Sequence, residues 1–240
     1  MPKKFTLFSG GKDSSVVLHL MKDCIDSAVY VDTGIALPEN NKFVESLCEE
    51  FGVDLIILKP EIDFWEYVKT AGFPTIRSLW CRYYLKIEPL RKFFRSIKPP
   101  AITYLGIRLA ESSQRRKFYS SNTSFSSIRN MKLRFDEKTN TWQFFPILEW
   151  SDIQVKRYLK EQRIKINPCY KLYGFSSCYF CPFIRKREFY LKLKARHPDL
   201  FSKIIKAERS LRSKGSALLT PDGKPLLISD IDRQTFLDSA

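Results

Sequence analysis

The chain has 240 residues, 44% of them hydrophobic, which is enough to bury one α/β core. It has no apolar run of about 18 residues and a predicted strand begins almost at the N-terminus, so we expect a cytoplasmic protein with no membrane contact and no signal peptide. The net charge of +15 favours a polyanionic partner, either a nucleotide or a nucleic acid, unless it only reflects solubility. With only two histidines, His-based triads and His-rich metal sites are poor hypotheses.

A glycine-rich turn follows the first predicted strand. The apolar run of residues 5–8 ends in S-G-G-K-D-S-S at residues 9–15, and a helical pattern then places Val16, Val17 and Leu20 toward a core. Glycines allow a sharp turn and a close approach to a ligand, and a helix start offers unpaired N–H groups to an anion. We therefore predict a phosphate-binding loop, made of Ser9, Gly10, Gly11, Lys12, Asp13 and Ser14. The alternative is a Gly-Gly turn that caps an ordinary helix.

Strands and helices alternate after this loop. Residues 27–31 form a predicted strand that ends in Asp32, Thr33 and Gly34, residues 38–51 a helix, and residues 54–58 a further strand. This alternation predicts a mainly parallel, twisted sheet with helices on both faces. Ligands of such sheets bind beyond the carboxyl ends of the strands, where both the glycine-rich loop and Asp32–Thr33–Gly34 are expected.

The middle of the chain adds a second group of candidates. Residues 61–98 are predicted to be helical in two pieces, broken at residues 72–74, and residues 101–107 to be a strand. Gly106 and Arg108 lie at the end of this strand, and Glu111 and Arg115 follow. Arginines in this position suit a clamp for phosphate or carboxylate, or else a solvated basic helix face.

The remaining elements complete one predicted domain. The Ser- and Asn-rich residues 119–131 are expected to form a mobile loop, residues 131–135 and 141–145 a hairpin, and Ser151 the start of a helix. The basic tail is expected to be mostly helical up to a turn at residues 220–223. We assign residues 1–184 to a nucleotide-binding domain with a cysteine cluster, and residues 185–240 to a basic extension packed on it.

These motifs, in their order, resemble the phosphoadenosine phosphosulfate reductase branch of the PP-loop superfamily over roughly residues 5–185. The matching segments are residues 9–14, 31–34, 80–81 with 86, 89–90, 106–108 with 111–112, 146–152, 167–170 and 178–182. The resemblance implies an adenine nucleotide, with its phosphates on the SGGKDS loop and its adenosine near Asp32, Thr33 and Gly34. Gly106 and Arg108 would then lie on the other side of the nucleotide.

The cysteines suggest a metal site. Cys178 and Cys181 form a Cys-x-x-Cys followed by proline, Cys169 is close in sequence, and Cys81 stands where the family places ligands. Four thiolates suit a [4Fe–4S] cluster, which the resemblance favours, or a structural Zn²⁺. Cys24 and Cys48 are expected to be ordinary buried cysteines in helices.

The chain departs from the family's reductases in two respects. They carry a cysteine near their C-terminus that attacks sulfur, whereas no cysteine follows Cys181 here, and Cys81 stands alone where cluster-binding members have a Cys-Cys pair. We therefore predict an ATP pyrophosphatase-type enzyme that adenylates an oxygen, which sulfur or nitrogen then replaces. Lys12 and Arg108 would balance phosphate charge, and Asp13 would hold Mg²⁺ or the loop.

The predicted partners are a tRNA or other nucleic acid as acceptor and a sulfur-donor protein. Two alternatives remain, a sulfonucleotide reductase and a non-catalytic subunit that binds nucleotide and cluster. Pyrophosphate release would separate the first function from the subunit, and salt-dependent nucleic-acid binding would separate it from the reductase.

Overall fold

The computed structural model describes residues 1–121, 126–128, 131–175, 178–184, 186–211 and 227–231. Seven strands form one sheet in the order β3-β2-β1-β4-β7-β6-β5. They are β1 (Lys4–Leu7), β2 (Ser27–Val31), β3 (Leu55–Leu58), β4 (Ala101–Leu105), β5 (Ser126–Ile128), β6 (Met131–Asp136) and β7 (Thr141–Phe145). Neighbouring strands are parallel from β3 through β2, β1 and β4 to β7. The last two strands, β6 and β5, pair antiparallel and form one edge of the sheet. The mainly parallel sheet predicted from the sequence is confirmed.

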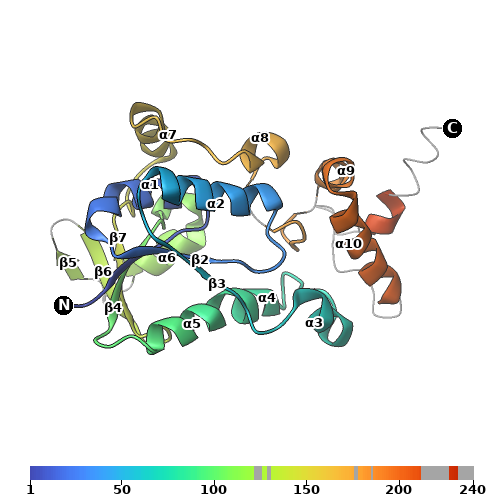
Figure 1. Cartoon of the computed structure of the whole chain (residues 1–240), viewed down its shortest axis with the longest axis horizontal. Helices are drawn as coiled ribbons and strands as arrows, with labels where there is room; N and C mark the ends of the chain where they lie inside the picture. The colour runs from blue at the N-terminus through green and yellow to red at the C-terminus, as the bar shows by residue number, and fades with distance from the viewer. Residues whose placement is uncertain (122–125, 129–130, 176–177, 185, 212–226, 232–240) are drawn as a thin grey trace.

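Helices cover both faces of this sheet (Figure 1). The labelled α-helices are α1 (Lys12–Met21), α2 (Pro38–Glu50), α3 (Phe64–Ala71), α4 (Trp80–Arg82), α5 (Glu88–Arg95), α6 (Ser113–Ser121), α7 (Asp152–Glu161), α8 (Cys169–Tyr173), α9 (Arg187–Arg196) and α10 (Pro198–Ser210), and residues 228–231 form a further helical turn. A π-helical turn, Tyr83–Ile87, joins α4 to α5. None of the described helices has the length and apolar character that crossing a lipid bilayer requires.

Two apolar clusters hold the helices to the sheet. On one face, α1, α2 and α7 bury side chains such as Val17, Val44 and Leu159 against the strands. On the other face, Phe94 of α5 packs on Phe5 with ring centroids 5.5 Å apart. Apolar burial of this kind contributes about 1.5–3 kcal/mol for each large side chain. The sheet is therefore fixed from both sides, and its carboxyl ends stay free to build a site.

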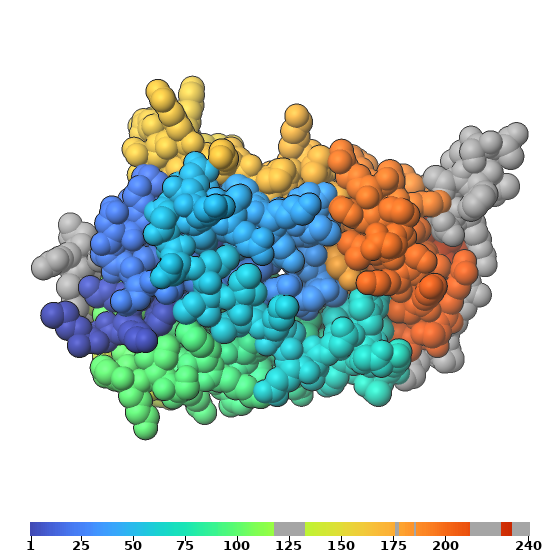
Figure 2. Space-filling model, viewed as in Figure 1, coloured from blue at the N-terminus to red at the C-terminus, as the bar shows by residue number. Residues whose placement is uncertain are grey.

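A third cluster joins the C-terminal helices to the rest of the chain. It combines side chains of α3, α8, α9 and α10 with the segment around Cys178 and Cys181, and Tyr190 is fully buried in it. In Figure 2 the surface of α9 and α10, in orange, lies directly against the surface of α3 and of the N-terminal elements. Glu208 of α10 accepts hydrogen bonds from the backbone N–H groups of Ile228 and Ser229, which ties residues 227–231 to the same cluster.

Two sequence expectations are corrected. Leu20 was expected in the core, but it is 38% exposed and Leu18 is buried instead, because α1 is covered by α7 as well as by the sheet. The loop expected over residues 119–131 contains the last turn of α6 and the edge strand β5, which pairs with β6. The turn expected at residues 220–223 lies outside the described residues.

Candidate functional site

Residues 9–14, the phosphate loop, join β1 to α1 through a left-handed glycine. Gly10 has φ +77°, and a Cβ at this position would lie 2.5 Å from Asn40 Oδ1. Only glycine fits such a position without strain or displacement. Gly11 precedes the helix and has no side chain to cap it, and the Tyr170 hydroxyl is the side-chain partner of one first-turn N–H, that of Lys12. The first turn of α1 therefore presents N–H groups at the end of β1, as an anion site requires.

Serine hydroxyls hold the loop in this shape. Ser14 Oγ donates to the carbonyl of Gly11 at 2.9 Å and accepts from the N–H of Ser9 at 3.3 Å. Ser15 Oγ donates to the same carbonyl at 3.0 Å. Both serine hydroxyls therefore engage the carbonyl of Gly11, an oxygen that would otherwise repel a phosphate.

Asn167 fastens the loop from a distant part of the sequence. Its Nδ2 donates to the carbonyl of Gly10 at 2.9 Å and to Asn40 Oδ1 at 2.7 Å. Its Oδ1 accepts from the N–H of Cys169, which fixes the orientation of the amide. Asn40 and Asn167 are both almost fully buried. A buried amide with all these partners makes the loop a rigid element.

Tyr170 of α8 forms one wall of the loop. Its hydroxyl accepts from the N–H of Lys12 at 3.3 Å, and Lys12 Nζ lies 4.2 Å from the centre of its ring. A cation over an aromatic face is stabilised by the ring quadrupole. Lys12 is therefore held beside the helix start instead of extending freely into solvent.

Gly106 and Arg108 bring the end of β4 against the same helix start. A Cβ on Gly106 would lie 2.7 Å from the backbone N of Ser14, so any larger residue would push β4 away from the loop. Arg108 is buried, and its guanidinium donates to Asp13 Oδ1 at 2.8 Å, to Asp152 Oδ1 at 2.7 Å and to the carbonyl of Trp150. Burial would lower the pKa of Arg108, but the two carboxylates raise it above its usual value.

This arrangement changes the expected roles of Arg108 and Asp13. Nε and both terminal nitrogens of Arg108 already have partners in the protein, so it does not extend to the open site as a phosphate clamp. The Asp13 carboxylate is paired with Arg108 and only 15% exposed, so it does not fit a free Mg²⁺ ligand. Asp13 and Arg108 instead lock the start of α1 to the start of α7.

A cavity of about 260 Å³, the central cavity, lies where β1 and β2 end. Ser9, Thr33, Asn40, Lys86 and Cys178 contribute to its lining. Lys86 comes from the π-helical turn, an irregularity that frequently marks a functional site. The cavity thus joins the phosphate loop to the turn after β2 and adds a lysine.

The turn at residues 32–34 separates this cavity from a neighbouring one. Asp32 Oδ1 accepts from the N–H of Gly34 at 3.0 Å, and Gly34 has φ +73°. The second cavity, of about 350 Å³, is lined by this turn and by Lys59 and Asp63. Asp32, Thr33 and Gly34 therefore lie at the sheet edge that the sequence predicts for them. Glu111 and Arg115 form an ion pair with each other farther along, after β4.

The four cysteines expected to share a metal do not converge. Burial, with a smaller contribution from nearby Cys178 and Cys181, raises the pKa of Cys81 to about 11, whereas burial and Glu39 raise that of Cys169 to about 12. All six cysteines are described, and among the described residues no group of three or more His, Cys, Asp or Glu side chains is placed to hold a metal ion. Among the described residues the structure therefore shows no site of the [4Fe–4S] or Zn²⁺ kind, which stays a prediction from the sequence.

Residues 178–181, the cysteine segment, instead contribute to the wall of the central cavity. Cys178 forms an antiparallel bridge with Ala36, and the N–H of Tyr179 donates to the carbonyl of Ile35 at 2.8 Å. Thr33 Oγ1 lies 3.8 Å from Cys178 Sγ. A thiol is therefore present at the mouth of the site.

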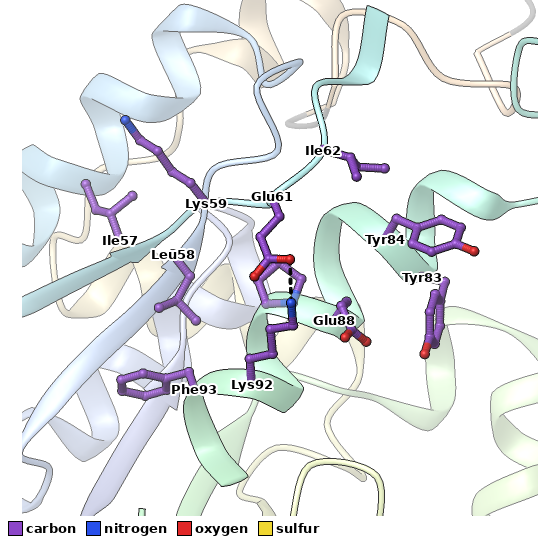
Figure 3. Close-up of a pocket in the computed structure, with 11 residues that line it drawn as sticks. Ile57, Leu58, Lys59, Glu61, Ile62, Tyr83, Tyr84, Glu88, Lys92 and Phe93 are labelled. Carbon is purple, nitrogen blue, oxygen red and sulfur yellow. Dashed lines mark ion pairs between the residues drawn. The ribbon is translucent and has the colours of Figure 1, made fainter. Parts of the chain in front are cut away.

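A larger cavity, of about 700 Å³, lies at the sheet edge beside β3 and is called the edge cavity. Figure 3 shows Glu61 and Lys92 paired in its interior, Lys59 extending away from this pair, and Tyr83 and Tyr84 along its side. Lys92 Nζ and Glu61 Oε2 form an ion pair at 2.5 Å. Its basic groups are matched by Glu61 and Glu88, so this cavity is not an anion site.

A glycine-rich SGGKDS loop between a parallel strand and a helix, facing a cavity at the carboxyl edge of the sheet, is typical of PP-loop proteins. The model of the phosphoadenosine phosphosulfate reductase domain matches residues 3–182, and the chain belongs to that family. The resemblance stated from the sequence is thus confirmed.

Individual relatives agree with this assignment. An uncharacterised protein of Methanocaldococcus jannaschii is 33% identical over 83% of this chain and 46% of its own length. A phosphoadenosine 5'-phosphosulfate reductase of Buchnera aphidicola is 28% identical over 70% of this chain, which spans 65% of that enzyme. The phosphoadenylyl-sulfate reductase structure from Candida auris matches 74% of this chain and 81% of its own, with a TM-score of 0.54 and 19% identity, and shows the shared fold.

Sequence reasoning missed four residues that shape the site, namely Asn40, Lys86, Asn167 and Tyr170. Three of them were part of motifs that matched the family, but nothing local indicates that Asn167 bonds to a glycine 157 positions away. Asn40 lies in an amphipathic helix, where a buried asparagine is a detectable signal that a polar partner is present.

Proposed function

We propose that the phosphate loop and the central cavity bind ATP, and that the protein is an adenylating PP-loop enzyme. The observation that carries this proposal is the start of α1 beside the central cavity, where Gly11 provides no capping side chain and Ser9 lines the cavity. Lys12 and Lys86 supply the positive charge there, while Ser9 and Thr33 offer hydroxyl groups. We place the phosphates at residues 9–14 and the adenosine beside Asp32, Thr33 and Gly34.

The remaining predicted residues take supporting roles. Asp13 and Arg108 position the phosphate loop, and Gly106 permits the close approach of β4. Glu111 and Arg115, paired on the neighbouring segment, stay proposed contacts on the other side of the nucleotide. Mg²⁺ accompanies ATP as a charge-neutralising ion, and no described residue is assigned as its ligand.

The proposed reaction has two steps. An acceptor oxygen attacks the α-phosphorus of ATP, the bond to the β-phosphate oxygen breaks, and pyrophosphate leaves. A sulfur or nitrogen nucleophile then attacks the carbon that bears the activated oxygen, and AMP leaves with that oxygen. The sulfur would come from a donor protein. Lysines at the loop favour both leaving groups because they offset developing negative charge.

Pyrophosphate release tests this function. The full chain is incubated with MgATP, total cellular RNA and sulfide or ammonium as the nucleophile, and pyrophosphate and AMP are quantified together. Equal amounts of AMP and pyrophosphate that depend on RNA support adenylation, and Lys12→Ala should lower the rate at least about tenfold. Tight ATP binding without any pyrophosphate would favour the non-catalytic subunit instead.

Sulfonucleotide reduction is a second candidate, because one observation favours it. Cys178 lines the central cavity, so a thiol stands where the sulfur of a bound sulfonucleotide would be attacked. Incubation with adenylyl sulfate or its 3'-phosphorylated form and an excess dithiol tests it. Sulfite formation that Cys178→Ser abolishes would place this function first.

A further inference from the structure

A second aromatic-walled cavity, of about 620 Å³, lies between α8, the segment after Cys181, and α9. We call it the aromatic cavity. Tyr170, Phe175, Phe183 and Phe189 contribute flat walls, and Phe175 and Phe189 lie 5.2 Å apart at an angle of 32°. Phe183 is 60% exposed, although it belongs to a segment whose neighbouring side chains are buried. An exposed ring beside an open cavity is available for stacking.

The rim of this cavity is basic. Lys171, Lys186 and Lys192 are exposed and line it, and Glu188 is its one acidic lining residue in the described part of the chain. Glu188 is paired with Lys192 at 2.7 Å, which leaves the positive charge of the other two lysines in excess. The edge cavity in Figure 3 is also walled by aromatic rings, but its charges balance. An anionic ligand with flat groups suits only the aromatic cavity of these two.

One side chain connects the aromatic cavity to the phosphate loop. Tyr170 lines the cavity, and the same residue contacts both the backbone N–H and the ammonium group of Lys12. A group bound against Tyr170 therefore lies one side chain away from the loop proposed to hold ATP. Because reacting atoms must approach to about 3–3.5 Å, a base held there is not itself attacked but anchors the strand beside the site.

We propose that the aromatic cavity binds an unpaired nucleobase of the nucleic-acid acceptor, with Lys171 and Lys186 on the flanking phosphates. The proposal rests on the adenylating function and names where its acceptor binds. Stacking on an aromatic side chain contributes about 1–3 kcal/mol for each base, and lysine contacts to phosphate add a salt-dependent contribution. The net charge of +15 would attract such a strand over the whole surface.

Binding of labelled single strands of about ten nucleotides tests this proposal, with RNA and DNA of one sequence as separate arms. Phe183→Ala should raise Kd about tenfold, and Lys186→Ala should raise Kd and reduce the salt slope by about one. Tyr83→Ala and Lys92→Ala remove a ring and a lysine from the edge cavity and should leave Kd unchanged. A duplex should bind more weakly, because its bases are already paired.

Alkylation of cysteines locates the bound strand independently. Cys181 lines the aromatic cavity, and Cys24 is exposed on a short 3-10 helix, Lys22–Cys24, outside this cavity. The reaction is run at alkaline pH because burial raises the pKa of Cys181. A single strand should slow the modification of Cys181 and leave that of Cys24 unchanged.

The outcomes separate this inference from the proposed function. ATP binding is measured by calorimetry on every variant, and Phe183→Ala should bind ATP as the unaltered chain does. Phe183→Ala and Lys186→Ala are each compared with the unaltered chain. If both bind ATP, release pyrophosphate and bind the strand as that chain does, the role of the aromatic cavity in strand binding is overturned and the proposed function is not. Duplex binding as tight as single-strand binding, or unprotected Cys181, would overturn it as well. If the unaltered chain binds the single strand but releases no pyrophosphate, the proposed adenylating function is overturned instead.

Discussion

At the scale of single residues, Gly10 is the position where backbone and packing constrain the phosphate loop together. Gly52 offers a matched control, because its φ of +64° is also left-handed but no atom of the described residues lies within 4 Å of the position that a Cβ would take. Gly52→Ala should cost only the backbone strain, about 1 kcal/mol. Gly10→Ala should cost about 3 kcal/mol, since it adds the clash with Asn40, and should weaken ATP binding. Urea unfolding of both variants measures the difference, and equal losses would contradict it.

Asp13 and Asp152 share Arg108 but differ in exposure, 15% against 71% of their side chains. Removing Asp13 leaves the buried Arg108 with only the exposed Asp152 as its carboxylate and costs about 1.5–3 kcal/mol, whereas an exposed pair is worth about 0–1 kcal/mol. Asp13→Ala should therefore destabilise the protein far more than Asp152→Ala does, as measured by chemical denaturation. Similar losses from both would show that Arg108 is not anchored through Asp13.

At the scale of elements, Glu39 couples the start of α2 to α8 and to the junction of α9 and α10. His197 Nε2 lies 3.0 Å from Glu39 Oε1, and the Tyr173 hydroxyl donates to the same oxygen at 3.2 Å. Burial would raise the pKa of Glu39, but these hydrogen bonds outweigh it and lower the pKa.

A lowered folded-state pKa means that Glu39 contributes stability above its unfolded pKa of about 4.3 and loses this contribution as pH falls through the folded value. Glu39→Gln should cost about 1–3 kcal/mol at neutral pH and flatten the loss of stability below about pH 4.3. Thermal unfolding across this pH range measures both effects. If Glu39→Gln lost stability below about pH 4.3 as steeply as the unaltered protein does, this coupling would be contradicted.

Cys169 provides a test of the cysteine arrangement. Because it is fully buried in α8, beside Glu39 instead of the other cysteines, Cys169→Ala should leave the iron, zinc and sulfide content of anaerobically purified protein unchanged. Metal content that falls with this substitution, and not with Cys24→Ala, would restore the four-cysteine site predicted from the sequence.

The elements that could be predicted are those with a local signal. Hydrophobic periodicity and the Pro38 start placed α2, and the Ser151 capping box placed α7. The prediction of a loop over residues 119–131 was wrong at β5, a short, polar edge strand. Its pairing with β6, which has no local sequence signal, makes it a strand. The hydrogen bonds of Asn167 and Arg108 could not be predicted, because their partners come from segments distant in the sequence.

At the scale of the whole molecule, three segments meet around the central cavity at the carboxyl ends of the strands. They are the phosphate loop, the turn at residues 32–34 and the cysteine segment. We propose that residues 185–240 belong to the same domain, since α9 and α10 share a core with α3 and α8. The positive charge of the chain then serves both ATP and a polyanionic acceptor. Its contribution to acceptor binding should fall linearly with the logarithm of salt concentration.

Calorimetric titration of ATP into the full chain tests the central claim most directly. The unaltered protein and the edge-cavity variant Lys92→Ala should bind one ATP with the same affinity. Ser14→Ala and Lys86→Ala, at the loop and in the central cavity, should each raise Kd about tenfold while remaining folded by circular dichroism. ATP affinity that is unchanged in both site variants, or lost only in Lys92→Ala, would contradict the placement of the nucleotide.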